Sequence, residues 1–138
     1  MENTNNNYIE SYINLQSLLT MQVEDQCHDD FLSFVRLVAP TIVSGFKMGR
    51  HIEVISDKLQ KVQDGELKRL MVFLPPRSSK SVICSKLFPA WYIGRNPEHE
   101  ILTISHSDQL SSDFGRSVRD IVNTEEFQKI FRGVALKS

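Results

Sequence analysis

The pair Lys80-Ser81, together with the residues that precede it, is the clearest candidate for a binding or catalytic site in this sequence. An apolar run at 70–74 stops at two prolines and gives way to a short polar turn, and Lys80-Ser81 then opens a predicted helix. In such an arrangement backbone N–H groups can surround phosphate oxygens, a lysine can reach the outer phosphates and a hydroxyl can bind Mg²⁺. The pattern at 75–81 therefore favours a phosphate-binding loop.

The usual pattern of such a loop, G-x-x-x-x-G-K-[ST], is incomplete here, since Leu74 and Ser79 occupy the two glycine positions. A glycine at position 79 would allow a positive φ and a close approach of the backbone, whereas a serine loses roughly 1 kcal/mol or more in that conformation. Two interpretations remain open. The segment is either a phosphate loop with a defect at Ser79, or an ordinary polar connection whose serine caps a helix.

The elements that would position this loop form a strand–helix–strand pattern. Residues 67–74 have the nearly continuous apolar character of a strand covered on both faces, and residues 101–105 form a second candidate strand. A helix from Lys80, interrupted near Pro89, would connect them as a right-handed βαβ unit. We therefore predict an α/β fold, an incomplete P-loop NTPase-type parallel sheet with an amino-terminal helical segment.

The remaining elements are predicted to be helices. Tyr8, Tyr12, Leu15 and Leu19 mark one face of an amphipathic helix at 8–21. Acids before Phe31 cap a second, largely apolar helix that ends or bends at Pro40. Further helices are expected at 50–63, after Ser107, and from Thr124 to Phe131, and another strand would begin at Val134. The predicted organisation is a disordered tail at 1–7, a helical segment at 8–66 and the first part of an ATPase domain at 67–138.

Composition gives a general setting for these elements. The 138 residues suffice for one domain, and no apolar run approaches the roughly 18 residues of a membrane helix. The polar, acidic amino terminus is unlike a secretory signal, so a cytosolic setting is expected. Residues 1–30 contain six acids and no lysine or arginine, while the remainder has an excess of five positive charges. Cys27 and Cys84 show no metal-site spacing and are predicted to be ordinary thiols.

Three blocks of sequence, at 74–81, 88–97 and 114–120, together closely resemble the amino-terminal ATPase region of the large terminase subunit of tailed bacteriophages. The phosphate loop of that family commonly has the form P-P-R-H-G-K-S, so Leu74 agrees with the family and Ser79 departs from it. Including similar residues upstream, the resemblance covers about residues 28–138.

The resemblance implies a role for each residue of the loop. Lys80 would contact the β and γ phosphates of ATP, Ser81 would bind Mg²⁺, and the backbone amides of Ser78, Ser79 and Lys80 would surround the phosphates. Arg77 would sense or stabilise the γ-phosphate. Arg77 and Lys80 are thus the candidate catalytic residues. The resemblance assigns no role to the two arginines of the third block, Arg116 and Arg119.

The family's large subunit is an ATP-driven motor that packs viral DNA through a portal and is joined to a nuclease domain. The resemblance implies viral DNA, the portal protein and the small terminase subunit as partners, in the cytoplasm of a bacterial host and without a membrane. Hydrolysis also needs an acid after a second buried strand, but the candidate strand here ends in Ser105-His106-Ser107. The family places its acidic pair, and its nuclease carboxylates, beyond the position of Ser138.

We therefore expect a truncated, amino-terminal piece that carries the phosphate loop but does not hydrolyse ATP alone. Its open sheet edges would favour self-association. The alternative is a non-enzymatic binding or assembly module, in which a terminase-like scaffold keeps a degenerate nucleotide loop.

Overall fold

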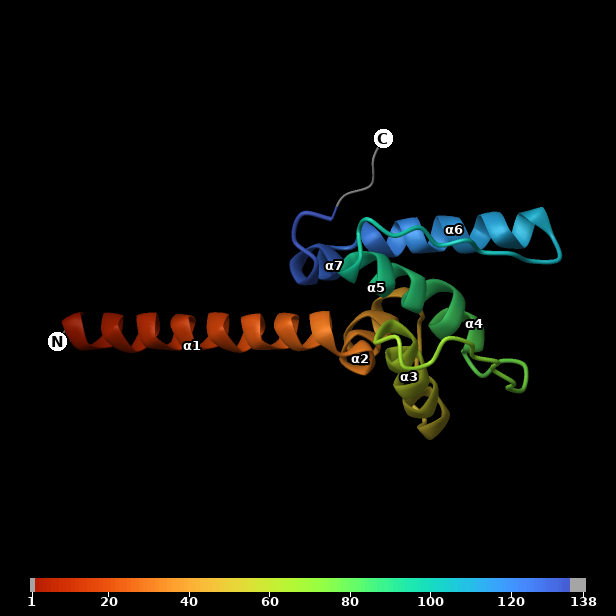
Figure 1. Ribbon diagram of the computed structural model, residues 1–138. Coiled ribbons are helices and arrows are strands. Elements are labelled where there is room, and N and C mark those ends of the chain that lie inside the picture. Colours follow the sequence, from red (N-terminus) through yellow and green to blue (C-terminus); the bar gives the residue numbers. More distant parts are fainter. Residues whose placement is uncertain (1, 135–138) are drawn as a thin grey trace.

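The structure is a computed structural model that describes residues 2–134, with side chains from residue 8 onward. A long helix projects from a cluster of shorter ones (Figure 1). In chain order the elements are α1 (Glu2–Asp29), α2 (Phe31–Ile42), α3 (Arg50–Gln63), α4 (Lys80–Val82), the π-helical turn η1 (Ile83–Leu87), α5 (Phe88–Arg95), α6 (Asp108–Val122) and α7 (Glu125–Ile130).

The core lies where α2, α3, α5, α6 and α7 meet the last turn of α1. Its largest members are aromatic: Phe31, Phe34, Trp91 and Phe127 are fully buried. Their rings contact one another at tilted and edge-on angles, with the centroids of Phe31 and Trp91 5.2 Å apart. Such pairs add to the free energy already gained by burying large apolar surfaces. The core is therefore built between helices.

Local capping explains where several helices begin. The Asp30 carboxylate accepts a hydrogen bond from the Ser33 N–H at 2.7 Å, and the Ser107 hydroxyl accepts one from Leu110 N–H at 3.2 Å. Thr124 caps α7 in the same way. Each cap satisfies a backbone donor that the first helical turn leaves without a partner. These predicted helix starts are confirmed, and α3 has the predicted bounds.

The helix that begins at Lys80 continues to Arg95 without a break, although Pro89 lies inside it. Proline has no N–H to donate, so it cannot form the usual helical bond. The turn before it widens instead, and the Phe88 N–H bonds the Ile83 carbonyl five residues back. This π-helical turn carries the chain past Pro89 as one continuous helical run.

The predicted α/β fold is wrong. Residues 2–134 contain no strand and hence no parallel sheet or βαβ unit. Both candidate strands, at 67–74 and 101–105, are irregular segments without ladder pairing. The first was predicted to be covered on both faces, yet Met71 and Phe73 are 77% and 80% exposed, and Leu102 in the second is 84% exposed.

The physical reason is that a strand is stable only with neighbours that satisfy its backbone and cover its faces. In the segment 67–74, one face packs against the helical core through Leu70, Val72 and Leu74. No second strand lies beside it in the described part of the chain, so apolar character alone does not produce a sheet.

Three smaller predictions also differ from the structure. Helix α1 includes residues 2–7, for which composition predicted a disordered tail, and it extends eight residues beyond the predicted end at residue 21. Helix α2 continues through Pro40 to Ile42. The strand predicted to begin at Val134 lies almost wholly outside the described residues.

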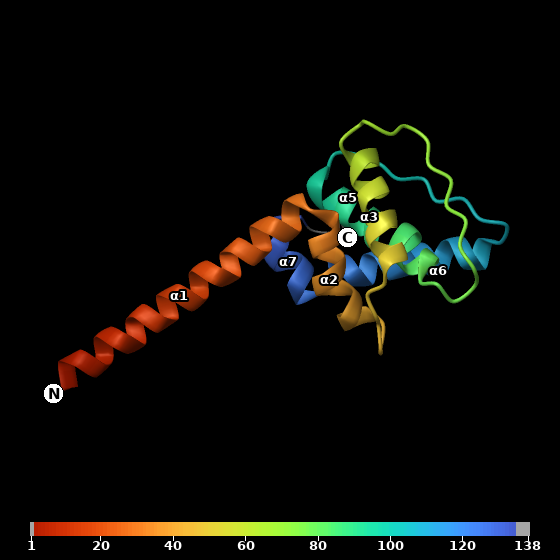
Figure 2. The ribbon, with the colours of Figure 1, turned by 90° about the horizontal axis from the view of Figure 1, so that it is seen from below.

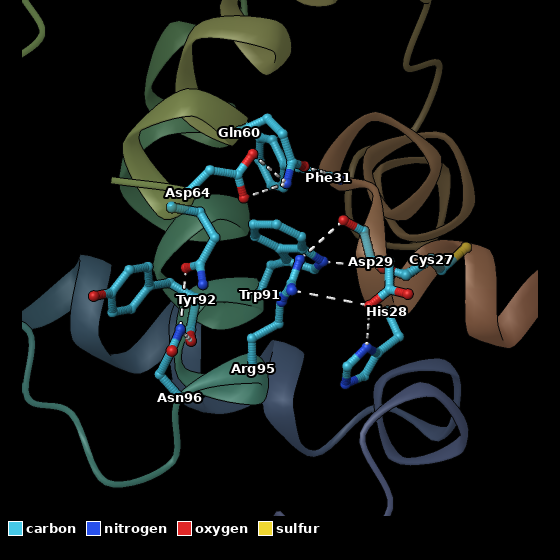
Figure 3. Close-up of polar contacts among 11 residues, drawn as sticks. Cys27, His28, Asp29, Phe31, Gln60, Asp64, Trp91, Tyr92, Arg95 and Asn96 are labelled. Carbon is cyan, nitrogen blue, oxygen red and sulfur yellow. Dashed lines mark hydrogen bonds and ion pairs between the residues drawn. The ribbon is translucent and has the colours of Figure 1, made fainter. Parts of the chain in front are cut away.

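A polar network joins the end of α1 to α3 and α5 (Figure 3). The Trp91 indole N–H donates to the Cys27 carbonyl at 3.0 Å, and the Arg95 guanidinium donates to the Asp29 carbonyl at 2.9 Å. Arg95 also lies over the Trp91 ring, 5.1 Å from its centroid. These bonds satisfy carbonyls in the last turn of α1, which have no helical partner of their own. The junction between α1 and α2 is thereby fixed to α5.

This geometry predicts that Trp91→Phe destabilises the protein by about 2–3 kcal/mol, because the change leaves a buried carbonyl without its donor and removes core volume. Urea unfolding followed by circular dichroism measures the loss, since Trp91 is the only tryptophan. The control is Phe73→Leu at a side chain that is 80% exposed, which should change the free energy of unfolding by less than about 0.5 kcal/mol. Equal effects of the two changes would contradict the assignment.

Stability at alkaline pH should depend on Cys27. Burial raises the pKa of the Cys27 thiol from 9.0 to about 11, and the Asp30 and Glu24 carboxylates add to the shift. Above pH 9 the unfolded chain releases a proton that the folded protein keeps, so the free energy of unfolding falls as pH rises towards 11. The slope attributable to this thiol is at most about 1.4 kcal/mol per pH unit. Cys27→Ala should show a shallower decline in urea titrations at pH 9 to 11, and an unchanged decline would refute this role.

Candidate phosphate-binding loop

The predicted loop connects the extended segment at 67–74 to the helix that begins at Lys80, and it projects from the helical body beside α4 (Figure 1). Residues 74–82 surround an open cavity of about 390 Å³. All five predicted phosphate-binding residues, Arg77, Ser78, Ser79, Lys80 and Ser81, line this cavity. The structure thus places them around one shared space.

The backbone of the loop is strained at two positions. Arg77 has a φ of 62° and Ser79 a φ of 59°, and they are the non-glycine residues with positive φ in the described part of the chain. The left-handed conformation costs an ordinary residue roughly 1–2 kcal/mol. Ser79 thus adopts the backbone conformation for which glycine is the usual residue, and it does so directly before the helix.

Local hydrogen bonds stabilise this conformation. The Ser78 hydroxyl donates to the Pro75 carbonyl at 2.7 Å, which closes the loop across three residues. The Ser79 carbonyl accepts the Ile83 N–H at 3.0 Å, the first bond of the helical run. The loop is therefore joined to the helix through Ser79 itself.

The charged and hydroxyl groups of the loop remain available for a ligand. Arg77 and Ser81 are exposed, and Lys80 is half-buried. Within residues 2–134, no acidic side chain forms an ion pair with Arg77 or Lys80. Lys80 lies close to Cys84, whose thiol pKa is raised by burial and partly lowered again by the Lys80 ammonium. Because Arg77 and Lys80 have no acidic partner in the described part of the chain, their positive charges are available to bind an anion at the strained turn.

The residue types in the loop fit a phosphate group better than they fit a metal ion alone. Lys80 and Arg77 offer positive charge and N–H donors, and the Ser81 hydroxyl is a possible Mg²⁺ ligand. The described residues hold no group of three or more acidic, histidine or cysteine side chains suited to a metal.

The arginines of the third block lie on α6, away from the residues that line the loop cavity. The Arg116 guanidinium pairs with the Asp113 carboxylate at 3.2 Å, and Arg119 is exposed. Both positions are typical of a solvated helix face.

The residues that hold the far end of this helix were not predicted from the sequence. Trp91 and Arg95 lie in the last two turns of the run that begins at Lys80, and they attach it to the end of α1 (Figure 3). They position the loop without touching it. The signal available in the sequence was a single tryptophan four residues before an arginine, a spacing that places both on one helix face.

No protein-family model, curated protein or solved structure matches this chain. No helix among the described residues is long and apolar enough to cross a membrane.

The strain at Ser79 predicts that Ser79→Gly stabilises the folded protein by about 0.5–1 kcal/mol, because glycine adopts a positive φ without steric cost. Ser81→Gly is the matched control. Its backbone is helical, so glycine there should destabilise by about 0.5–1 kcal/mol. Chemical denaturation of both variants measures the difference, and a destabilising Ser79→Gly would show that the left-handed conformation is not kept in solution.

Proposed function

We propose that residues 75–81 bind the phosphates of ATP with Mg²⁺, and that the chain is an amino-terminal piece of a protein like the large terminase subunit of tailed bacteriophages. The observation that carries the nucleotide proposal is the left-handed Ser79 directly before Lys80. This conformation turns the backbone into the helix, and Lys80 and Ser81 follow it at the first helical positions. Backbone amides at a helix start attract anions.

In this proposal Lys80 contacts the outer phosphates, Arg77 stabilises the γ-phosphate and Ser81 binds Mg²⁺. The amides of Ser78, Ser79 and Lys80 complete the contacts. The proposal needs only the loop and the helical run behind it, whose far end is fixed by Trp91.

The biological setting follows from the sequence resemblance alone. Viral DNA, the portal protein and the small terminase subunit are the proposed partners, and the bacterial cytoplasm is the proposed location. The described residues offer the loop no acidic cluster for metal-assisted hydrolysis. We therefore propose nucleotide binding without appreciable turnover for this chain.

A second candidate function is a non-enzymatic binding or assembly module. The observation that favours it is Ser79 itself, whose side chain occupies a position where family members have glycine. The two candidates differ in whether the loop has a measurable, Lys80-dependent affinity for nucleotide.

Titration with a fluorescent ATP analogue and Mg²⁺ separates these functions. Lys80→Ala should weaken binding about 10-fold to 100-fold, because it removes a charge-assisted contact to phosphate. Lys68→Ala is the control, since this exposed lysine lies outside the loop cavity, and it should leave affinity within about twofold. Ser79→Gly should bind at least as tightly as the natural sequence.

Equally poor binding by the natural protein and Lys80→Ala would reject the nucleotide proposal and favour the assembly module. Phosphate release is a separate measurement on the same samples. Lys80-dependent turnover would contradict the proposal that the chain binds ATP without hydrolysing it.

A further inference from the structure

Helix α1 presents an apolar surface that the rest of the described chain does not cover. Its last turns contact the body through Cys27, which is buried, and Glu24, which pairs with Arg132 at 2.9 Å. The preceding part stands free of the other helices in two perpendicular views (Figures 1 and 2). Helix α1 nevertheless carries nine large apolar side chains that are 47–71% exposed, and eight of them line no cavity with the body.

Four of these side chains form a narrow line along the helix, which we call the α1 seam: Tyr8, Tyr12, Leu15 and Leu19. Their spacings of four, three and four place them within about 60° of one another at 100° per residue. This is the pattern of a seam between two paired helices. The acids Glu10, Glu24 and Asp25 fall about 170°, 150° and 110° from the middle of the seam.

We propose that the α1 seam pairs antiparallel with the same seam of a second copy of this chain. This proposal does not depend on the nucleotide site. A twofold pairing needs a self-complementary surface, and antiparallel alignment supplies one: Tyr8 comes opposite Leu19 of the second copy, and Tyr12 comes opposite Leu15. Every large aromatic side chain then meets a smaller aliphatic one, in four layers related by the twofold axis.

The helix dipoles and the position of the body favour this orientation. The other helices lie at one end of α1 (Figures 1 and 2), so a parallel pair would bring two bodies to the same end. A parallel pair would also align the two helix dipoles, which is unfavourable, whereas in the antiparallel pair the dipoles oppose. The two bodies then lie at opposite ends of the helix pair.

Charge disfavours a lipid surface as the occupant. Helices that lie on membranes usually carry lysine and arginine on their polar face to attract anionic lipids. The polar face of α1 has only acids and neutral side chains. A second copy covers the apolar seam with an equally apolar surface and places no charged side chain against it. Because two single helices bury a modest area, the dimer should be weak and depend on protein concentration.

The test is sedimentation of the full chain over a range of concentrations, with two charge-matched variants. Leu15→Glu and Met21→Glu each add one carboxylate at similarly exposed positions of α1, 55% and 50%. Leu15 lies in the seam and Met21 on the opposite side of the helix. We expect a monomer–dimer equilibrium in the natural protein, at least about a tenfold weaker dimer for Leu15→Glu, and less than about a twofold change for Met21→Glu.

Orientation is tested by disulfide formation beside the seam. In the antiparallel pair residue 9 of one copy lies near residue 16 of the other, so a mixture of Ile9→Cys and Gln16→Cys proteins should form the mixed 9–16 disulfide, identified by peptide mass spectrometry. A monomer at every concentration, equal weakening by the two glutamate variants, or preferential 9–9 and 16–16 links would each overturn the proposal. Circular dichroism of each variant verifies that α1 is retained.

Discussion

The hydrogen bond from the Trp91 indole to the Cys27 carbonyl is the contact on which the arrangement of this protein most depends. A helix leaves its last carbonyls without internal partners, and α1 ends inside the molecule, beside the fully buried Trp91. The indole N–H satisfies one of these carbonyls and Arg95 satisfies another. One face of α5 therefore both buries the Trp91 ring and supplies the donors for the last carbonyls of α1.

This contact also determines the position of the loop. The helical run from Lys80 to Arg95 is attached to α1 at its carboxyl end, while its amino end carries the strained turn. A rigid helix transmits the position of one end to the other. The side chains that would contact phosphate are therefore located by residues more than two helical turns away from them, and the loop itself needs only short-range hydrogen bonds.

Short-range hydrogen bonds also explain how the loop keeps its strained backbone. Two non-glycine residues in left-handed conformations cost stability, and such costs persist where neighbouring structure fixes the backbone. Here the fixing contacts are the Ser78 hydroxyl on one side and the Ile83 N–H on the other. The sequence departs from glycine at Ser79 without changing the backbone conformation that glycine would favour.

Features that depend on neighbouring residues were predictable from sequence, and features that depend on distant contacts were not. Asp30, Ser107 and Thr124 identified helix starts because a cap acts within one turn. Arg77 to Ser81 were expected to lie together because they are contiguous, and they line one cavity. The sheet was predicted wrongly because residues 67–74 have strand-like composition, whereas a strand requires a partner that local composition cannot specify. Trp91 was missed because its acceptor lies 64 residues away.

The π-helical turn at Ile83–Leu87 has a consequence for the loop that concerns helical phase. A π turn is equivalent to one residue inserted into an α-helix, and one residue corresponds to about 100° of rotation. The wider spacing of the π turn absorbs that rotation, since its five residues rotate the chain about as far as four α-helical residues do. The turn lies between the loop and Trp91, so Lys80 keeps about the angle to the buried indole that a regular helix one residue shorter would give. A one-residue deletion within Ile83–Leu87 would therefore restore regular α-helical spacing and leave the loop on about the same side of the molecule.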